Sequence, residues 1–333
     1  MKKLPLILLL TAAVSATAGF LIARYLATPV PATSPTTPSE TPVSMSETRA
    51  GGYRFINPLL ECDNFDPSGL NNTLKMEEEV KNFVQQVLND KRATHVSVYF
   101  RDLNNGPWMG INEDEIYSPA SLLKVPVMMA VLKKAEKEPG FLKKKLRYEH
   151  VMEQSVKANI VDAPMIKLGN SYTVEDLLNR MIEHSDNEAK ELLFAEVGEA
   201  AFMKVMSDLG IDLTGLKPGD DFMSVKQYSS FFRILFNATY LSKEMSEFGL
   251  SLLSKTDFKV GIVAGIPEGT LISHKFGERA IQGGAAHQLH DCGIVYKEHT
   301  PYLICIMTRG SDFNTQAGVI AEVSKIVYRN VQP

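Results

Sequence analysis

Cysteine, tryptophan and excess positive charge are all scarce in this chain of 333 residues, which contains three cysteines and one tryptophan. Cys62, Cys292 and Cys305 are too few for a disulfide-dense scaffold, and none of them forms a CxxC zinc or redox pair. The 35 basic residues are outnumbered by 39 acidic ones, which argues against the basic footprint of a nucleic-acid-binding protein. Stability must therefore come from an apolar core, for which the 44% of hydrophobic residues suffice.

Several catalytic and metal-binding motifs are also missing. The chain contains no G-x-S-x-G, H-E-x-x-H or G-x-x-x-x-G-K segment, which removes the enzyme classes that depend on them. His287, His290 and Cys292 stand close together, but on a strand the two histidines would face opposite sides of the sheet. We therefore predict no metal site and no cofactor.

An uncharged run of 20 residues, Leu4 to Ala23, lies near the N-terminus. As a helix it would be about 30 Å long, enough to cross the hydrocarbon core of a bilayer. The alternative is a signal peptide cleaved near Ala18, although the apolar run continues past that point. We expect residues 1–26 to be a membrane anchor or signal peptide, so that the rest of the chain is extracytoplasmic, either tethered to the membrane or secreted.

Residues 27–55 are rich in proline, serine and threonine and contain little apolar bulk. Such a segment cannot bury enough surface to offset its ordering entropy, so we expect an extended linker. No second linker and no internal repeat follow, so residues 56–333 are expected to form one domain and to act as a monomer.

Helical and strand patterns follow one another along this domain in a defined order. The expected elements are a helix at 74–91, strands at 94–103 and near Trp108, mainly helices from 121 to 253, strands within 269–278, 292–298 and 301–310, and a helix at 315–328. This order predicts an α/β fold of the α+β type: a five-stranded antiparallel sheet flanked by helices, with an all-helical lobe beside it.

Ser121 and Lys124 form an S-x-x-K pair at the start of a predicted helix. Ser118 is the expected N-cap and Pro119 the first helical residue, which places Ser121 in the first turn. Lys124 lies three residues on and on the same face, within reach of the Ser121 hydroxyl. A lysine can act as a base only if burial or another cation destabilises its ammonium form. Taken alone, the pattern has little specificity.

Two further motifs follow it. Ser185-Asp186-Asn187 lies in a helical segment, and Lys275-Phe276-Gly277 lies on a predicted strand. S-x-x-K, S-D-N and K-T-G, in this order, are the motif set of class A β-lactamases and penicillin-binding proteins. Residues 75–330 resemble that family, and the segments leading into the second and third motifs resemble it as well. The resemblance implies a β-lactamase-like fold and an active-site serine hydrolase.

The resemblance also implies the catalytic roles. Ser121 is the expected nucleophile that forms an acyl-enzyme, and Lys124 takes its proton. Ser185, helped by Lys275, passes a proton to the leaving nitrogen. The positive charge of Lys275 is expected to favour the neutral amine of Lys124.

Four residues are expected to bind the substrate. Asn187 would hold its amide side chain and orient Lys124, and the backbone N–H groups of Ser121 and Glu278 would form the oxyanion hole. Gly277 and Phe276 belong to the strand beside the substrate. Phe276 replaces a residue whose hydroxyl binds the substrate carboxylate in the family, and a phenyl ring cannot donate that hydrogen bond. The alternative is that only the backbone matters here and the ring packs outward.

The loop between the second and third motifs departs from the family. Class A β-lactamases use a glutamate of an ExxLN segment there to activate the deacylating water, whereas residues 210–224 contain no glutamate and are too few to hold that loop in full. Asp221 is expected to be structural, and Asp212 or Asp220 are the candidate substitutes. A positioned general base contributes about 10²–10⁴ in rate, so deacylation is expected to be slow.

Three functions remain open. The first is an exported class A β-lactamase-family hydrolase acting on β-lactams, and the second is a penicillin-binding D-alanyl-D-alanine peptidase acting on peptidoglycan stem peptides. The third is a sensor that is acylated by or binds a β-lactam or wall fragment without turnover.

Cys292 and Cys305 are expected to lie opposite each other if the hairpin turns at Glu298-His299. An exported protein permits a disulfide there, but two packed thiols are the preferred expectation.

Overall fold

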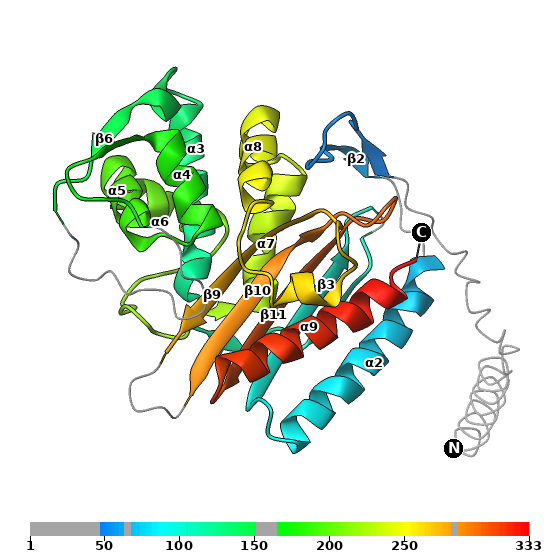
Figure 1. The fold of residues 1–333 in the computed structure, drawn as a ribbon. Helices are drawn as coiled ribbons and strands as arrows, with labels where there is room; N and C mark the ends of the chain where they lie inside the picture. The colour runs from blue at the N-terminus through cyan, green and yellow to red at the C-terminus, as the bar shows by residue number, and fades with distance from the viewer. Residues whose placement is uncertain (1–46, 63–67, 105, 151–164, 281–285, 333) are drawn as a thin grey trace, which may run out of the picture. The chain divides into compact units, whose positions relative to one another are not determined.

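A five-stranded antiparallel sheet forms the centre of the fold (Figure 1). The structure, a computed structural model, describes residues 47–62, 68–104, 106–150, 165–280 and 286–332. The strand order is β4-β3-β11-β10-β9, so β9 and β4 are the edges. The strands are β3 (His95–Asp102), β4 (Trp108–Ile111), β9 (Ile272–Arg279), β10 (His287–Val295) and β11 (Tyr302–Gly310). The predicted α+β architecture is confirmed.

Two long helices cover one face of this sheet. They are α2 (Ser68–Asn89) and α9 (Phe313–Asn330), which lie side by side in Figure 1, with the 3₁₀ turn η3 (Ile262–Gly265) packed against α9. The apolar residues of α2 recur at helical spacing and are buried, as with Val80, Val84 and Val87. Helix α2 begins six residues before the predicted start at 74, in a stretch where apolar residues are sparse.

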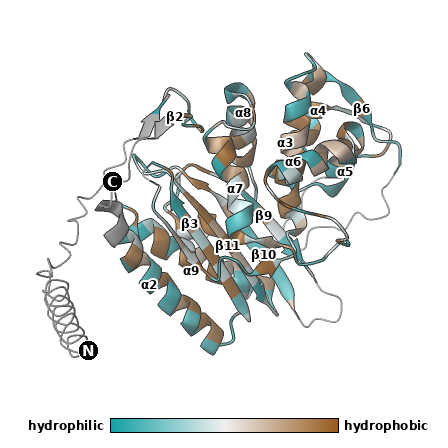
Figure 2. Ribbon diagram, turned by 180° about the vertical axis from the view of Figure 1, so that it is seen from behind, coloured by the Kyte–Doolittle hydropathy of each residue, from teal (hydrophilic) through white to brown (hydrophobic). Residues whose placement is uncertain are grey.

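The other face carries α7 (Val225–Phe236) and the helical lobe. The lobe helices are α3 (Lys124–Ala135), α4 (Val174–Glu183), α5 (Asn187–Val197) and α6 (Glu199–Asp208), with α8 (Lys243–Leu253) beside them. Helix α3 is buried on all sides from Lys124 to Leu132, as expected of a helix at the centre of a bundle. In Figure 2 the apolar colour accordingly runs along the central strands and the inner sides of the helices.

Short strands and turns complete the described part of the chain. These are β1 (Glu47–Arg49), β2 (Leu59–Cys62), β5 (Ile116–Tyr117), β6 (Lys145–Arg147), β7 (Ser171–Thr173), β8 (Met223–Ser224), and the 3₁₀ turns η1 (Ala120–Leu123) and η2 (Phe141–Lys143). The strands pair as β1–β2, β5–β8 and β6–β7. Two to four residues are too few to give an alternating pattern, so the sequence did not reveal them. Strand β1 and the buried Phe55 lie inside the range 27–55 that composition assigned to a linker.

The predicted anchor or signal peptide, residues 1–26, lies outside the described residues. Within the described ranges, the helices are all too short or too polar to cross a membrane.

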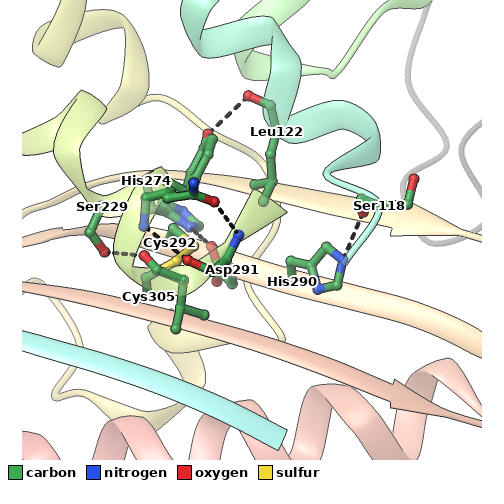
Figure 3. Close-up of a disulfide and its surroundings, with 12 residues drawn as sticks. Ser118, Leu122, Ser229, His274, His290, Asp291, Cys292 and Cys305 are labelled. Atoms are coloured by element: carbon green, nitrogen blue, oxygen red, sulfur yellow. Dashed lines mark hydrogen bonds and ion pairs between the residues drawn. A yellow bond between two sulfur atoms is a disulfide. The ribbon is translucent and has the colours of Figure 1, made fainter. Parts of the chain in front are cut away.

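Cys292 and Cys305 are joined by a disulfide between the neighbouring strands β10 and β11 (Figure 3). The two residues are directly opposite in the register, as the predicted hairpin required. The preference for two packed thiols was wrong: the two sulfur atoms are bonded, and both side chains are fully buried at opposite positions of neighbouring strands.

Strand β10 and helix α7 together hold the turn that carries Ser121. Ser118 is not the N-cap that the sequence predicted: η1 begins at Ala120, after Pro119, without a side-chain cap. Instead Ser118 is buried, its N–H donates to Gln288 Oε1 at 2.9 Å, and its carbonyl accepts from His290 Nε2 at 3.0 Å (Figure 3). Tyr228 of α7 donates its hydroxyl to the Leu122 carbonyl at 2.9 Å.

The buried His290 makes the stability of this arrangement depend on pH. Burial lowers the pKa of His290 from 6.5 to about 4, so the folded protein holds its ring neutral where the unfolded chain would protonate it. The free energy of unfolding should therefore fall as pH decreases from about 6.5 to about 4, by about 1.4 kcal/mol per pH unit from this group. Denaturant titrations of the native protein and of His290→Gln at several pH values measure this slope. If the free energy of unfolding had the same dependence on pH in both proteins, the prediction would be contradicted.

Candidate active site

The Lys124 amine lies at the centre of the site. Its Nζ is 2.8 Å from Ser121 Oγ, 3.0 Å from Ser185 Oγ and 2.5 Å from Asn187 Oδ1. The structure thus brings Ser121 of η1 and Lys124 of α3 together with Ser185 and Asn187, which lie 61 and 63 residues after Lys124. Ser121 is partly exposed, so a substrate can reach the hydroxyl that Lys124 contacts.

Lys275 of β9 extends this arrangement on the other side of Ser185. Its Nζ lies 3.1 Å from Ser185 Oγ, and the lysine is fully buried. Ser121, Lys124, Ser185 and Lys275 therefore form one continuous chain of hydrogen-bonding groups. Such a chain can carry a proton away from the serine hydroxyl and return it to a leaving group.

The connection between α4 and α5 is shaped to present Ser185. Ser185 has a φ of 55°, in the left-handed region that non-glycine residues rarely adopt. The Asp186 side chain caps α5 by accepting from Ala189 N at 3.0 Å, and its second oxygen accepts from Ile166 N at 2.9 Å. These two bonds fix the residue that follows Ser185 to α5 and to the segment at Ile166, and the backbone of Ser185 keeps a conformation that costs about 1–3 kcal/mol.

Burial is the main reason why Lys124 can be neutral, and so accept a proton, in this site. Its side chain is 2% exposed, and desolvation lowers its pKa from 10.5 to about 7. Lys190 is the second cause, while Asp186 and Glu278 oppose the shift. The expected repulsion between the two lysines is found in the pKa of Lys275, which burial and then the charge of Lys124 lower. Near neutral pH a large fraction of Lys124 is therefore unprotonated and able to accept a proton.

The pKa of Lys275 is also lowered, first by burial and then by the charge of Lys124. Asp291 of β10 opposes this shift and belongs to a buried pair, in which His274 Nδ1 lies 2.8 Å from Asp291 Oδ1 (Figure 3). The other carboxylate oxygen of Asp291 accepts from Ile262 N at 2.9 Å. Neither His274 nor Asp291 stands in a motif, so the sequence did not identify this acidic neighbour of Lys275.

Strand β9 runs directly against the η1 turn at Gly277. A Cβ added to Gly277 would lie 2.7 Å from the Pro119 carbonyl oxygen and 3.1 Å from Leu122 N. Only glycine fits this approach, which places the strand segment that ends in Glu278 beside the turn that carries Ser121. The predicted oxyanion hole needs these two backbone segments to be neighbours.

Residues 76–331 match the model of the β-lactamase enzyme family. The chain belongs to this family. A curated relative, the extended-spectrum β-lactamase PER-1 of Pseudomonas aeruginosa, is 26% identical over 242 residues, which are 66% of this chain and 77% of PER-1. The resemblance stated from the three motifs is confirmed.

Solved structures of similar fold include both β-lactamases and a penicillin-binding protein. The TLA-1 extended-spectrum β-lactamase has a TM-score of 0.66 and 20% identity, over 76% of this chain and 98% of that one. PBP-A has a TM-score of 0.63 and 20% identity, over 75% and 95% of the two chains. A variant of PBP-A is known as an acyl-enzyme with penicillin G, with a TM-score of 0.63 and 19% identity over 77% and 96%.

Phe276, the residue that departs from the family motif, does not line the site. Its ring is fully buried and stacks on Phe258, with centroids 4.5 Å apart. The ring belongs to the core cluster that includes α2 and α9, so the expectation that it packs outward was wrong, and only the backbone of Phe276 is left to face the site. The Lys275 Nζ lies 4.0 Å from the ring centroid, so the Phe276 ring forms part of the surroundings of the Lys275 amine.

Glu278 contributes more than the backbone N–H that the sequence assigned to it. Its carboxylate acts on both lysines, raising the pKa of Lys124 and of Lys275 against the effect of burial. A negative charge at this place keeps the pKa of Lys124 from falling further. The motif set carries no signal for it, because the position follows the third motif.

The aspartates of the short loop are engaged in local structure. Asp221 accepts from Gln288 Nε2 and from Arg309, both at 2.9 Å, as a structural residue would. Asp212 accepts from the backbone N–H of Thr214 at 2.9 Å, and Asp220 likewise closes a turn of the loop at 2.8 Å. None of these contacts is with Ser121 or Lys124.

A largely apolar cavity of about 500 Å³ lies between this loop and η1. Pro119, Ala120 and Leu123 form its wall on the side of the nucleophile. The other lining residues are Ser118, Phe194, Glu199, Phe202, Met203, Leu213, Leu216, Lys217, Pro218, Gly219, Phe222 and Arg279. Glu199, at the start of α6, is the one carboxylate among these described residues, and it is exposed. Glu199 precedes the loop between the second and third motifs, so no motif marks it.

The histidines of β10 do not form a metal site in the described structure. His290 is bonded to Ser118, whereas His287 stacks on Phe313 of α9, so the two lie on opposite faces as predicted. A different group, Glu183, His184 and Asp257, has ligand atoms within 4.8 Å of one another. There His184 Nδ1 is already hydrogen-bonded to Asp257 at 2.5 Å, so the cluster is explained without an ion.

The pKa of Lys124 should appear in the reaction of Ser121. Because the neutral amine is the reactive form and its pKa is about 7, the acylation rate constant should rise about tenfold per pH unit below pH 7 and level off above it. Stopped-flow measurement with benzylpenicillin between pH 5 and 9 tests this. Lys190→Gln removes a charge that lowers this pKa and should move the midpoint to higher pH. A profile that is flat, or unmoved in the variant, would count against Lys124 as the base.

Proposed function

We propose that this protein is an active-site serine enzyme that is acylated by β-lactams at Ser121 and releases the acyl group slowly. The observation that carries the proposal is the chain of contacts from Ser121 through Lys124 and Ser185 to Lys275, with the pKa of Lys124 lowered to about 7. Membership of the β-lactamase enzyme family and the similarity to PBP-A support it.

Acylation follows from these contacts. Ser121 Oγ attacks the carbonyl carbon of the lactam while its proton passes to Lys124 Nζ, 2.8 Å away. The backbone N–H groups of Ser121 and Glu278 stabilise the oxyanion. The carbon–nitrogen bond then breaks, and the nitrogen takes a proton from Ser185, which is replaced from Lys124 along the 3.0 Å contact. Lys275 supplies positive charge beside Ser185 during this transfer.

Slow deacylation follows from the loop. Hydrolysis of the ester needs a base that takes a proton from water next to the acyl carbon. The aspartates of the short loop are used in turns and ion pairs, and the one carboxylate of the adjoining cavity, Glu199, is exposed at the start of α6. The described residues therefore include no counterpart of the positioned glutamate that class A β-lactamases use.

The same observation favours a second candidate, a D-alanyl-D-alanine peptidase of the cell wall. Such an enzyme needs the acylation machinery, and its natural acyl-enzyme is intercepted without a dedicated glutamate. A sensor without turnover is the third reading. A peptide ending in D-Ala-D-Ala separates them: repeated release of D-alanine, many molecules per protein, indicates the peptidase, whereas one D-alanine released per protein with a permanent acyl adduct indicates the sensor.

We also propose that the domain works outside the cytoplasm as a monomer, tethered to the membrane by residues 1–26. The uncharged run from Leu4 to Ala23 and the disulfide between Cys292 and Cys305 support this, because disulfides persist mainly in oxidising compartments. Protease accessibility of the domain in intact spheroplasts tests the location, and release into the medium would indicate cleavage near Ala18 instead.

The lifetime of the adduct tests the main proposal. The full-length protein, incubated with benzylpenicillin, should gain the mass of one penicilloyl group within seconds and keep it for at least minutes after the free drug is removed. The expected deacylation rate is about 10²–10⁴ lower than with a positioned base. Intact-protein mass spectrometry over seconds to hours measures it. Complete consumption of the drug with only a transient adduct would instead show that a deacylating group is present.

Substitution of the nucleophile tests the assignment of Ser121. Ser121→Ala should abolish the adduct and leave the thermal midpoint nearly unchanged, because the small side chain is partly exposed and hydrogen-bonded to Lys124. Ser207→Ala, an exposed serine on α6, is the matched control and should be acylated like the native protein. If Ser121→Ala still carried a penicilloyl group, another residue would be the nucleophile.

A further inference from the structure

A second cavity lies at the opposite edge of the main sheet from β9. Its volume is about 270 Å³, and it lies between α7 and the strands β3 and β4. The lining residues are Tyr99, Arg101, Trp108, Lys226, Ser229, Ser230, Arg233 and Leu303. None of these lining residues belongs to the Ser121 site, and the edge strands β4 and β9 are four strand spacings, about 19 Å, apart.

Regular structure places these residues together. Leu303, Arg101 and Trp108 are successive partners across β11, β3 and β4, so their side chains stand in one row on the same face of the sheet. Lys226 and Arg233 lie one above the other on α7, seven residues apart and therefore on one side of the helix. The sheet edge forms the floor of the cavity and α7 forms its wall.

The cavity concentrates positive charge. Three of its lining residues, Arg101, Lys226 and Arg233, are cationic, and no lining residue in the described structure is acidic. Asp114 lies 3.7 Å from Lys226 Nζ, but its side chain is 78% exposed. Neither Arg101 nor Arg233 forms a salt bridge with any residue that the structure describes. Like charges held together in a concave surface attract anions.

Trp108, the only tryptophan of the chain, lies at the same cavity. It is 43% exposed and stacks on Tyr99 with ring centroids 5.8 Å apart. The Lys226 ammonium lies 5.3 Å from the Trp108 ring centroid, which ties the aromatic pair to the cationic cluster. An anion that displaces or orders Lys226 would therefore change the environment of Trp108.

We propose that this cavity binds the phosphate group of a small phosphomonoester. A phosphomonoester carries a charge of about −1.5 to −2 at pH 7 and offers three acceptor oxygens, which matches two guanidinium groups and one ammonium. Guanidinium groups bind phosphate oxygens in pairs, and the organic part of the ligand has Trp108 and Tyr99 beside it. A monocarboxylate has a single charge and would leave two of the three cations without a counter-charge.

Titration of the full-length protein with glycerol 3-phosphate at pH 7.5 and constant ionic strength tests the proposal, with Trp108 fluorescence as the signal. A saturable change is expected, and propionate should bind at least about tenfold more weakly. Arg233→Gln removes an exposed guanidinium, and it should weaken the binding of glycerol 3-phosphate about tenfold or more, as should Arg101→Gln. Arg147→Gln, an exposed arginine of β6, is the matched control and should bind like the native protein.

The proposal is overturned if the native protein gives no saturable change, if propionate binds equally well, or if Arg233→Gln binds with native affinity. Acylation of Ser121 by benzylpenicillin serves as the independent check of folding, because that site lies at the other edge of the sheet. An Arg233→Gln protein that is acylated normally but no longer binds glycerol 3-phosphate supports the cavity site specifically. Failure of acylation in the native protein would affect the proposed function and leave this test intact.

Discussion

The withdrawal of one amine from water is the constraint around which this structure is organised. Lys124 is 2% exposed at the head of a helix that is buried on every side, and water cannot solvate its ammonium form. A lone charge in such a place is costly, so the proton is lost at a pH where a free lysine would keep it. The helical lobe surrounds α3 and excludes water from the Lys124 amine.

The charged groups near the Lys124 amine determine how far its pKa is lowered. Burial and Lys190 lower the pKa of Lys124, whereas Asp186 and Glu278 raise it. Asp186 also caps α5, so the same carboxylate shapes the turn of Ser185 and raises the pKa of Lys124. The base strength is therefore a balance between dehydration and a few fixed charges. Any change that admits water to α3 would shift that balance toward an ordinary, protonated lysine.

Local spacing made much of the site predictable. Ser121 and Lys124 are three residues apart on consecutive helical turns, and the order of the three motifs located Ser185 and Lys275. Ser118 was misassigned because serine before proline is a good cap in isolation, while its actual bonds go to β10, some 170 residues away. Strand alternation places Phe276 on the opposite face from Lys275, but no local pattern reports that Phe258 covers that face.

The sheet architecture was predictable for a similar reason, since its strands are long enough to show alternation. The short strand pairs were not, and neither was the cationic cavity, because Arg101 and Arg233 meet only after α7 has packed on the sheet. The charges on the two lysines also depend on residues outside the motifs, such as Asp291 and Glu278. The features that could not be predicted from the sequence therefore all depend on contacts between distant segments.

The disulfide has a consequence for how the molecule opens. Lys275, Cys292, Cys305 and Tyr99 are successive partners in one row across four strands, so the covalent bond lies at the level where the site's lysine is attached. Strand β9 is at the edge, with a neighbouring strand on one side only. Because β10 and β11 are fastened together, a fluctuation that releases β9 need not spread inward. The smallest unit of local unfolding at the site is then a single strand, which can detach and return to an intact template.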